Sequence, residues 1–486
     1  MPTDLRYRPR HARRGFQPPS PPRPVRRLVA VAAALVMAVP LAAGLGLRLA
    51  GRPDRPHQPA PPRATGAATP VATGAPAPAA PVLHRLRITT HPPGARLVIR
   101  TAEGSVRSVR TPFAGRVAEG HVELALTMPG RNRLEQTIDL TKNRSVDLWL
   151  DEKGQILHKL GQFSTGPAPK QVAFSPDGSE IWVTDLGGDG IEVFDAHTMK
   201  RLADVDLGHK GAVEVIFTKD GSTVYASQME TASVYEIDRA TRKVRRHLFT
   251  TGSWSKVLAL SPDEKRLYVS NWVSDDVSEI DLVTGKERRR FHTVDTPRGL
   301  YVTPDGKRLY VAGFQDGEIQ RFDLRTLHSK ILLRTGGAIR HLVGDPARGL
   351  LYVDDMAGDA IYRVDLAAET VRMLARTDHM PNTIDLSPDG RVLYVSDRGR
   401  NNPVSYYRPG PEWGSVLAID TATGRILDAI VGGNQTTGLD VSTDGTTLAF
   451  SDFLDNRVSL YAVPAYQTLL AGRGGRAAAH RAELAK

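Results

Sequence analysis

Basic residues recur at one position of a repeated pattern, directly before each predicted innermost strand. The seven aligned positions are Lys170, Val213, Lys256, Arg298, Arg340, Asn382 and Thr437. Four of them are cationic, and cations gathered at one opening attract anions by focusing the electric field. We therefore predict a site for an anionic or polar ligand at Lys170, Lys256, Arg298 and Arg340, with His341 and His379 beside them. The alternative is that each base pairs with a neighbouring loop carboxylate: Asp275, Asp316, Asp355 or Asp397.

Aromatic side chains fall in the loops predicted to surround the same opening. Trp254, Trp272 and Trp413 lie there, and exposed aromatics often contact a ligand, although packing one loop on another is the competing role. The longest such loop, around Arg398 to Trp413, also holds Tyr406 and Tyr407. Loops on rigid scaffolds carry function disproportionately, so we expect this loop to set partner specificity.

No catalytic motif is present. The chain contains no His-Glu-x-x-His, Gly-x-Ser-x-Gly or phosphate-binding Gly-Lys-Ser/Thr sequence, and it has no cysteine, which excludes thiolate chemistry. The catalytic residues are thus unknown and no cofactor is predicted. A metal-assisted lactone hydrolase is the alternative to a binding module, with a divalent metal and a dominant effect of replacing His379 or Asp397.

A repeat of about 42 residues positions these side chains. Its marker, Ser-Pro-Asp-Gly and variants, occurs seven times between residues 175 and 445, with steps of 42 or 43 residues and one of 55. Each unit indicates four short strands, as in a propeller blade. The aspartates that end the third strands are expected to bond the turn backbone; they are Asp195, Asp238, Asp281, Asp323, Asp365 and Asp420.

The segment Leu267-Tyr268-Val269-Ser270-Asn271 resembles the Tyr-Val-Thr-Asn signature of YVTN-repeat proteins. This resemblance implies a seven-bladed β-propeller over residues 151–470. Proteins of this kind include lactone hydrolases, periplasmic binding proteins, archaeal surface-layer proteins and redox-enzyme subunits. Residues 156–160 read as a strand without a repeat of its own. We expect that strand to complete the last blade and remove an exposed sheet edge.

Residues 83–150 alternate apolar and polar residues between Gly and Pro turns, which predicts a small antiparallel β-sandwich. Pro93-Gly94-Ala95, Thr111-Pro112 and the flanking glycines resemble PEGA domains. That resemblance implies an interaction or envelope-attachment module without catalytic residues. A rigid adaptor is the other reading.

The N-terminal region indicates a membrane anchor. Residues 28–47 are uncharged and apolar, long enough for one transmembrane helix, and they follow a basic tail at 1–27 expected to stay cytoplasmic. A cleaved signal peptide is the alternative. Residues 51–82 are a Pro/Ala-rich linker, and residues 471–486 are predicted to be a basic disordered tail.

The charge distribution argues against nucleic acid as a partner. The chain carries +11 overall, but residues 151–470 hold 37 basic and 44 acidic side chains. We therefore predict an all-β protein with one N-terminal transmembrane helix, whose C-terminal domains are periplasmic or extracellular. It would be a monomeric propeller that acts as a scaffold and binds an envelope protein, peptide or glycan. The N-terminal helix would anchor it in the inner membrane.

Overall fold

The computed structural model describes residues 81–208, 210–250 and 252–486. The predicted cytoplasmic tail (1–27), the predicted transmembrane segment (28–47) and nearly all of the predicted linker (51–82) lie outside these residues. In the described part of the chain, no helix combines the length and the apolar character needed to cross a membrane.

Residues 83–149 form two sheets that share one hydrophobic core. The strands of the first sheet are, in spatial order, β4 (Phe113–Ala118), β1 (Leu83–His91) and β7 (Arg144–Trp149). The strands of the second are β3 (Val106–Arg110), β2 (Arg96–Thr101), β5 (Gly120–Thr127) and β6 (Leu134–Leu140). The prediction of a purely antiparallel module is wrong for one pair, because β1 and β7 run parallel. Five strands separate them in the sequence, which gives the chain the length that a parallel crossover requires.

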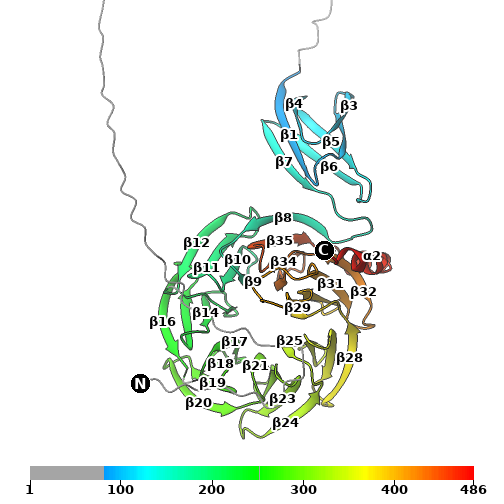
Figure 1. Ribbon diagram of the computed structural model, residues 1–486. Coiled ribbons are helices and arrows are strands. Elements are labelled where there is room, and N and C mark those ends of the chain that lie inside the picture. Colours follow the sequence, from blue (N-terminus) through cyan, green and yellow to red (C-terminus); the bar gives the residue numbers. More distant parts are fainter. Residues whose placement is uncertain (1–80, 209, 251) are drawn as a thin grey trace, which may run out of the picture. The chain divides into compact units, whose positions relative to one another are not determined.

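Residues 158–462 form seven four-stranded antiparallel sheets arranged in a ring (Figure 1). The first three sheets contain β9 (Pro169–Phe174), β10 (Glu180–Asp185), β11 (Gly190–Asp195) and β12 (Arg201–Asp206); β13 (Glu214–Phe217), β14 (Thr223–Gln228), β15 (Ser233–Asp238) and β16 (Lys243–Phe249); and β17 (Ser255–Leu260), β18 (Arg266–Asn271), β19 (Asp276–Asp281) and β20 (Lys286–His292).

The next three sheets contain β21 (Pro297–Val302), β22 (Arg308–Gly313), β23 (Glu318–Asp323) and β24 (Ser329–Arg334); β25 (Ile339–Asp345), β26 (Leu350–Asp355), β27 (Ala360–Asp365) and β28 (Thr370–Arg376); and β29 (Pro381–Leu386), β30 (Val392–Asp397), β31 (Ser415–Asp420) and β32 (Ile426–Val431). The last sheet contains β33 (Thr436–Val441), β34 (Thr447–Asp452), β35 (Arg457–Ala462) and β8 (His158–Ser164).

Strand β8 closes the ring. It pairs antiparallel with β35, from Arg457 opposite Ser164 to Ala462 opposite His158. The prediction that a strand from before the first repeat completes the last sheet is confirmed, although β8 begins two residues later than expected. The sheet edge of β35 is thereby covered, which removes a template for aggregation.

The repeat aromatics pack between neighbouring sheets. Trp182, Tyr268, Tyr310, Tyr352 and Tyr394 are each at most 1% exposed. The strand-ending aspartates bond turn backbone as predicted: Asp195 accepts from the Thr198 amide at 2.7 Å, and five others repeat the contact. These carboxylates are therefore committed to the turns and form no ligand array.

The C-terminal residues are ordered, so the prediction of a disordered tail over 471–486 is wrong. Helices α1 (Tyr466–Ala471) and α2 (Gly475–Glu483) follow the ring, and α2 lies beside β32 (Figure 1). His480 is fully buried and its Nε2 lies 2.6 Å from Asp378 Oδ2, and Arg476 pairs with Glu483 on the same helix. Composition indicated a solvated basic tail, whereas these basic groups have partners.

Candidate functional site

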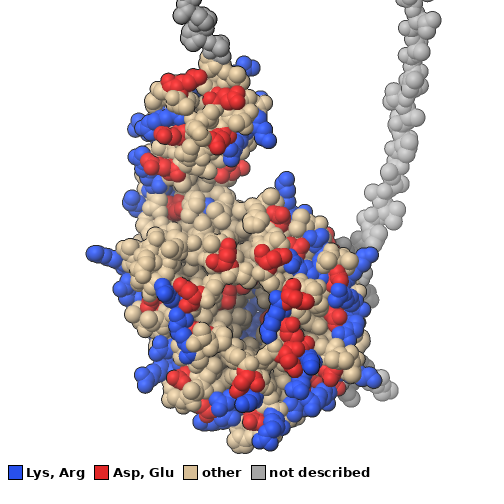
Figure 2. Space-filling view, turned by 180° about the vertical axis from the view of Figure 1, so that it is seen from behind, with Lys and Arg blue, Asp and Glu red and all other residues tan. Residues whose placement is uncertain are grey.

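Four of the basic residues predicted for the site lie at the same position of their strands around the ring. Lys170, Lys256, Arg298 and Arg340 are each the second residue of an innermost strand: β9, β17, β21 and β25. Sequence reasoning placed these residues just before the strands, so the strands begin slightly earlier than expected. The space-filling view shows a hollow at the centre of the ring (Figure 2).

A fifth cation joins them. Arg398 directly follows β30, and its charge acts on Lys170, Arg298 and Arg340. Lys256 is 9% exposed, Arg298 8%, Arg340 5% and Arg398 3%, while Lys170 is half-buried. We call these five residues the channel cations. Few proteins bury so many like charges at one level, because each ion loses its hydration.

The channel cations have no carboxylate partners. Within the described residues, none of the five lies within 4.0 Å of an Asp or Glu oxygen. The alternative that Asp275, Asp316, Asp355 and Asp397 neutralise them is therefore wrong. Asp275 and Asp355, for example, accept backbone amides of Thr296 and Ala338 instead.

The cost of burying these charges lowers the pKa values of the channel cations. Burial lowers the pKa of Lys170 and Lys256 well below the usual lysine value, and the charges of Arg298 and Arg340 lower both further. Burial also lowers the pKa of Arg340 well below its ordinary value, with Arg298 adding to the effect. The site is positively charged and uncompensated, which is the electrostatic condition that favours a bound anion.

Two buried carboxyl groups lie near the channel cations but serve the backbone. Burial raises the pKa of Glu214 and of Asp354 to about 7 each. Asp354 Oδ1 accepts the amides of Arg340 and His341, and Glu214 Oε1 accepts the amide of Leu258 at 3.4 Å. At most two negative charges therefore face three arginines, while the lowered pKa of Lys170 and Lys256 makes the charge of the two lysines depend on pH.

Glu214 and His341 belong to a wider set of acceptors that join neighbouring innermost strands. Each such side chain accepts an amide of the next innermost strand, so that backbone donors facing the channel are satisfied. The pairs are Gln171 with Val215, Glu214 with Leu258, His341 with Ile384, Asp385 with Val441 and Asp440 with Phe174. Burial lowers the pKa of His341 to about 3, which keeps its acceptor nitrogen unprotonated. His341 thus has a structural role.

Aromatic rings support the cations. Lys256 Nζ lies 3.5 Å from the centre of the Trp272 ring, and the Arg298 guanidinium carbon lies 5.4 Å from the same ring. Trp272 is 7% exposed and packs with Trp254 and Phe314, so its ring holds cations in place and is not an exposed anchor. Cation–π contacts of this kind are strongest where water is excluded.

Asn382 occupies the same level on β29 and was aligned with the cations, but sequence reasoning did not include it in the site. It is fully buried, and neither its amide nitrogen nor its amide oxygen has a hydrogen-bond partner among the described residues. A buried amide without partners costs free energy. Its position in the aligned set was the available signal, since Asn is the one amide there.

Only some residues of the long loop between β30 and β31, residues 398–414, contact the channel cations. Tyr406 lies under Arg398, with 4.1 Å between the guanidinium carbon and the ring centre, and its neighbour Tyr407 is half exposed. His379 lies 3.0 Å from Glu412 on this loop. The structure thus brings Tyr406 to the channel cations, whereas the His379 ring lies between Glu412 and Arg400 of the loop, with 3.0 Å from His379 Nδ1 to Glu412 Oε2 and 3.0 Å from His379 Nε2 to Arg400 Nη2.

The end of the chain holds the same loop. The amide of Trp413 donates to the Leu484 carbonyl at 2.8 Å, and the amide of Lys486 donates to the Pro411 carbonyl at 3.1 Å. Lys486 Nζ also lies 4.4 Å from the Trp413 ring centre. Trp413 is therefore engaged by the C-terminal residues.

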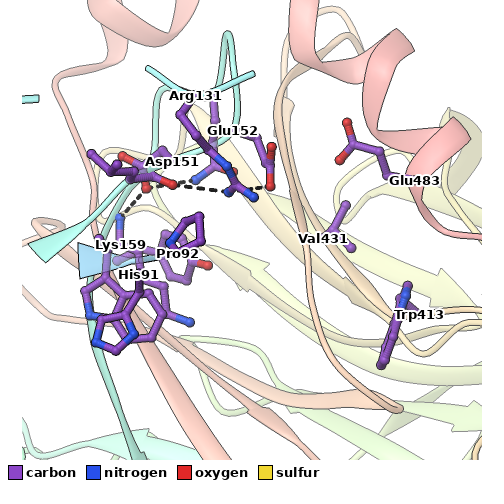
Figure 3. Close-up of a pocket in the computed structure, with 13 residues that line it drawn as sticks. His91, Pro92, Arg131, Asp151, Glu152, Lys159, Trp413, Val431 and Glu483 are labelled. Carbon is purple, nitrogen blue, oxygen red and sulfur yellow. Dashed lines mark hydrogen bonds and ion pairs between the residues drawn. The ribbon is translucent and has the colours of Figure 1, made fainter. Parts of the chain in front are cut away.

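Trp413 also lines a separate cavity of about 640 Å³ (Figure 3). Polar groups in this cavity bind one another: Arg131 pairs with Glu152, and Lys159 donates its amide to Asp151. Lys159 Nζ covers the Trp149 ring at 4.0 Å. These charged groups of the cavity have partners within the chain, whereas among the described residues Asn382 has none and the channel cations have no carboxylate partner.

Among the described residues, no three His, Asp or Glu side chains are grouped so that they could hold a metal ion. His379 is paired with Glu412, and Asp397 is completely buried beside Ser415. The donor set that a metal-assisted lactone hydrolase would need is thus not found in the part of the chain that the structure covers.

Comparison with known proteins supports the propeller fold. A family model described as a YNCE-like beta-propeller matches residues 214–435. Hydrazine synthase of Kuenenia stuttgartiensis has a chain with a TM-score of 0.53 and 20% identity, covering 62% of this chain and 97% of that one, a likeness of fold alone. Antigen Lp49 of Leptospira interrogans is 51% identical over 82 residues, which is 17% of this chain and 18% of that relative's length. The ring is a β-propeller.

Proposed function

We propose that this protein is a ligand-binding scaffold of the cell envelope, whose β-propeller binds an anionic ligand in its central channel. The observation that carries the proposal is the group of five channel cations, four of them less than a tenth exposed, which have no carboxylate partner among the described residues. A protein that buries such charges recovers their cost only when a counter-charge is bound. Tyr406 and the loop over residues 398–414 lie next to these cations and would contact whatever partner approaches the channel.

The proposed location rests on the sequence. The apolar segment 28–47 after a basic tail supports an inner-membrane anchor with the propeller in the periplasm or outside the cell. The linker at 51–82 would hold the folded part away from the membrane. We further propose that the ring is a seven-bladed YVTN-type propeller. Residues 83–150 would be a PEGA-type module that attaches the propeller to the envelope or acts as a spacer.

Thermal unfolding of the full chain in detergent tests the binding. Sodium phosphate should raise the Tm relative to sodium chloride at equal ionic strength, since a ligand that binds only the folded state stabilises it. The triple variant K256Q/R298Q/R340Q should lose this increase. An equal increase in the variant would refute the channel as the anion site.

Protease treatment of intact and lysed spheroplasts tests the location. The propeller should be cleaved in intact spheroplasts if it lies outside the inner membrane. Protection until lysis would place it in the cytoplasm and contradict the scaffold role in the envelope. No observation on the described residues favours the alternative of a metal-assisted lactone hydrolase.

A further inference from the structure

The depth of the channel cations limits the size of their ligand. Lys256, Arg298, Arg340 and Arg398 retain less than a tenth of their exposure. The charged backbone of a polymer needs an open groove along which successive charges can be contacted. A ligand that reaches these side chains must instead enter the ring, so it must be compact.

The charge balance sets the ligand's valence. Three of the channel cations are arginines, which stay protonated and present forked donors suited to the paired oxygens of carboxylates and phosphates. Glu214 and Asp354 already accept backbone amides, and a pKa of about 7 leaves each of them about half ionised at neutral pH, so together they offset about one of the three arginine charges. An anion with two charges therefore balances the arginines, whereas an anion with a single charge leaves positive charge uncompensated.

Asn382 indicates a bound ligand independently of the charges. It is on the second position of β29, the level of Arg298 and Arg340 on their strands, and it is completely buried with both amide atoms unpartnered. The unpartnered Nε of Arg398 repeats the pattern. Buried polar groups in native proteins almost always have partners, so a partner from outside the chain is indicated.

We infer that the channel binds one small oxyanion with two or more negative charges, a polycarboxylate or a compact phosphate, enclosed among Arg298, Arg340, Arg398 and Asn382. This inference rests on the proposed anion-binding function and specifies its ligand. The guanidinium groups bind the oxyanion oxygens, and the Asn382 amide donates to one of them. Trp272 and Tyr406 hold the cations that surround it.

Isothermal titration of the full chain in detergent tests the inference with four probes: citrate, pyrophosphate, acetate and poly-glutamate. Citrate or pyrophosphate should bind at one site per chain, at least about 100-fold more tightly than acetate, because several charge-assisted hydrogen bonds replace one. Comparison of citrate with pyrophosphate separates a carboxylate from a phosphate ligand.

Variants at Asn382 provide the sharpest readout. N382L should weaken binding of the preferred probe about tenfold or more, since it removes a hydrogen bond to a charged group. The ligand-free variant should unfold at the same or a higher temperature, because an unpartnered amide is replaced by an apolar group. If Leu does not pack, N382A makes the same test. K286Q, on the exposed outer strand β20, is the matched control and should bind as the wild type does.

The outcomes separate the inference from the function on which it rests. Poly-glutamate that binds as tightly as citrate, with no effect of N382L, would place an anion site on the surface and overturn the enclosed small ligand alone. Equal affinities for acetate and citrate would also overturn it. If none of the four probes binds, the proposed anion-binding function fails as well.

Discussion

Replacing Lys256 by Met should stabilise the protein in the absence of an anion, although it removes a native contact. Lys256 is 9% exposed, has no carboxylate within 4.0 Å among the described residues, and has its Nζ 3.5 Å from the centre of the Trp272 ring. A methionine side chain is similar in length and also packs well on aromatic rings. The substitution thus removes the charge and keeps most of the packing.

The magnitude follows from three contributions. Lys256 Nζ and the Arg298 guanidinium carbon lie 3.5 Å and 5.4 Å from the centre of the Trp272 ring, so the two charges are at most about 9 Å apart. Two like charges at that separation repel by about 2 kcal/mol at an effective dielectric constant of about 20. Burying an unpaired ammonium adds a penalty of several kcal/mol, of which local relaxation recovers part. Loss of the cation–π contact costs about 2 kcal/mol, so K256M should raise the free energy of unfolding by about 2 kcal/mol.

The effect should depend on pH in one direction. Burial lowers the pKa of Lys256 in the folded state, so the penalty is complete below that folded pKa. It disappears as the pH rises toward the ordinary lysine pKa of about 10.4, where the unfolded chain also loses the proton. The stability advantage of K256M should therefore shrink on going from about pH 7 to about pH 10.

Urea unfolding of dialysed protein in chloride buffer measures both effects. K286M, an exposed lysine on β20 of the same sheet, is the matched control and should change the free energy of unfolding by less than about 0.5 kcal/mol. A K256M variant that is less stable than the wild type at about pH 7 would refute the reasoning, because Lys256 would then be compensated within the chain.

Three further perturbations have defined outcomes. Deletion of residues 158–164 uncovers the edge of β35 and should cause aggregation, measured by light scattering; a soluble deletion variant that melts cooperatively would contradict the closure by β8. H480A removes one of the three partners of the buried Asp378, which also bonds Ser415 and Arg481, and should destabilise the C-terminal segment by about 1 kcal/mol, measured as faster amide hydrogen exchange in residues 475–486; unchanged exchange would argue that α2 is held elsewhere. Burial raises the pKa of Asp440 well above its ordinary value, with Asp385 adding to the shift, so wild-type stability should fall as the pH rises from about 4 through the folded pKa. D440N should flatten this dependence in urea unfolding at several pH values, and an unchanged slope would show that another group causes it.

The sheets and most of the channel cations could be predicted from the sequence, because both recur with the repeat. Turn aspartates and strand aromatics recur at fixed spacing, so one alignment placed Lys170, Lys256, Arg298 and Arg340 together. The same alignment contained Asn382. Its lack of partners depends on distances to other strands, which a linear pattern does not contain.

The remaining features of the site depend on contacts between distant segments. Arg398 directly follows β30, the place that Trp272 has after β18 and Phe314 after β22, and an alignment of the innermost strands alone does not include this position. The burial of His480 depends on Asp378, a hundred residues earlier, and a segment rich in Ala, Gly and Arg gave no sign of it. Trp413 has its place from the same C-terminal contacts.

Diffraction from crystals of the full chain grown with selenate tests the central claim most directly. Selenate is a compact oxyanion with two charges, and selenium gives an anomalous signal that identifies it. An anomalous peak about 4 Å from the guanidinium carbons of Arg298, Arg340 and Arg398 is the predicted result, consistent with hydrogen bonds of about 2.8 Å to the anion oxygens. A channel without a peak, in crystals that show selenate bound at surface arginines, would contradict the account.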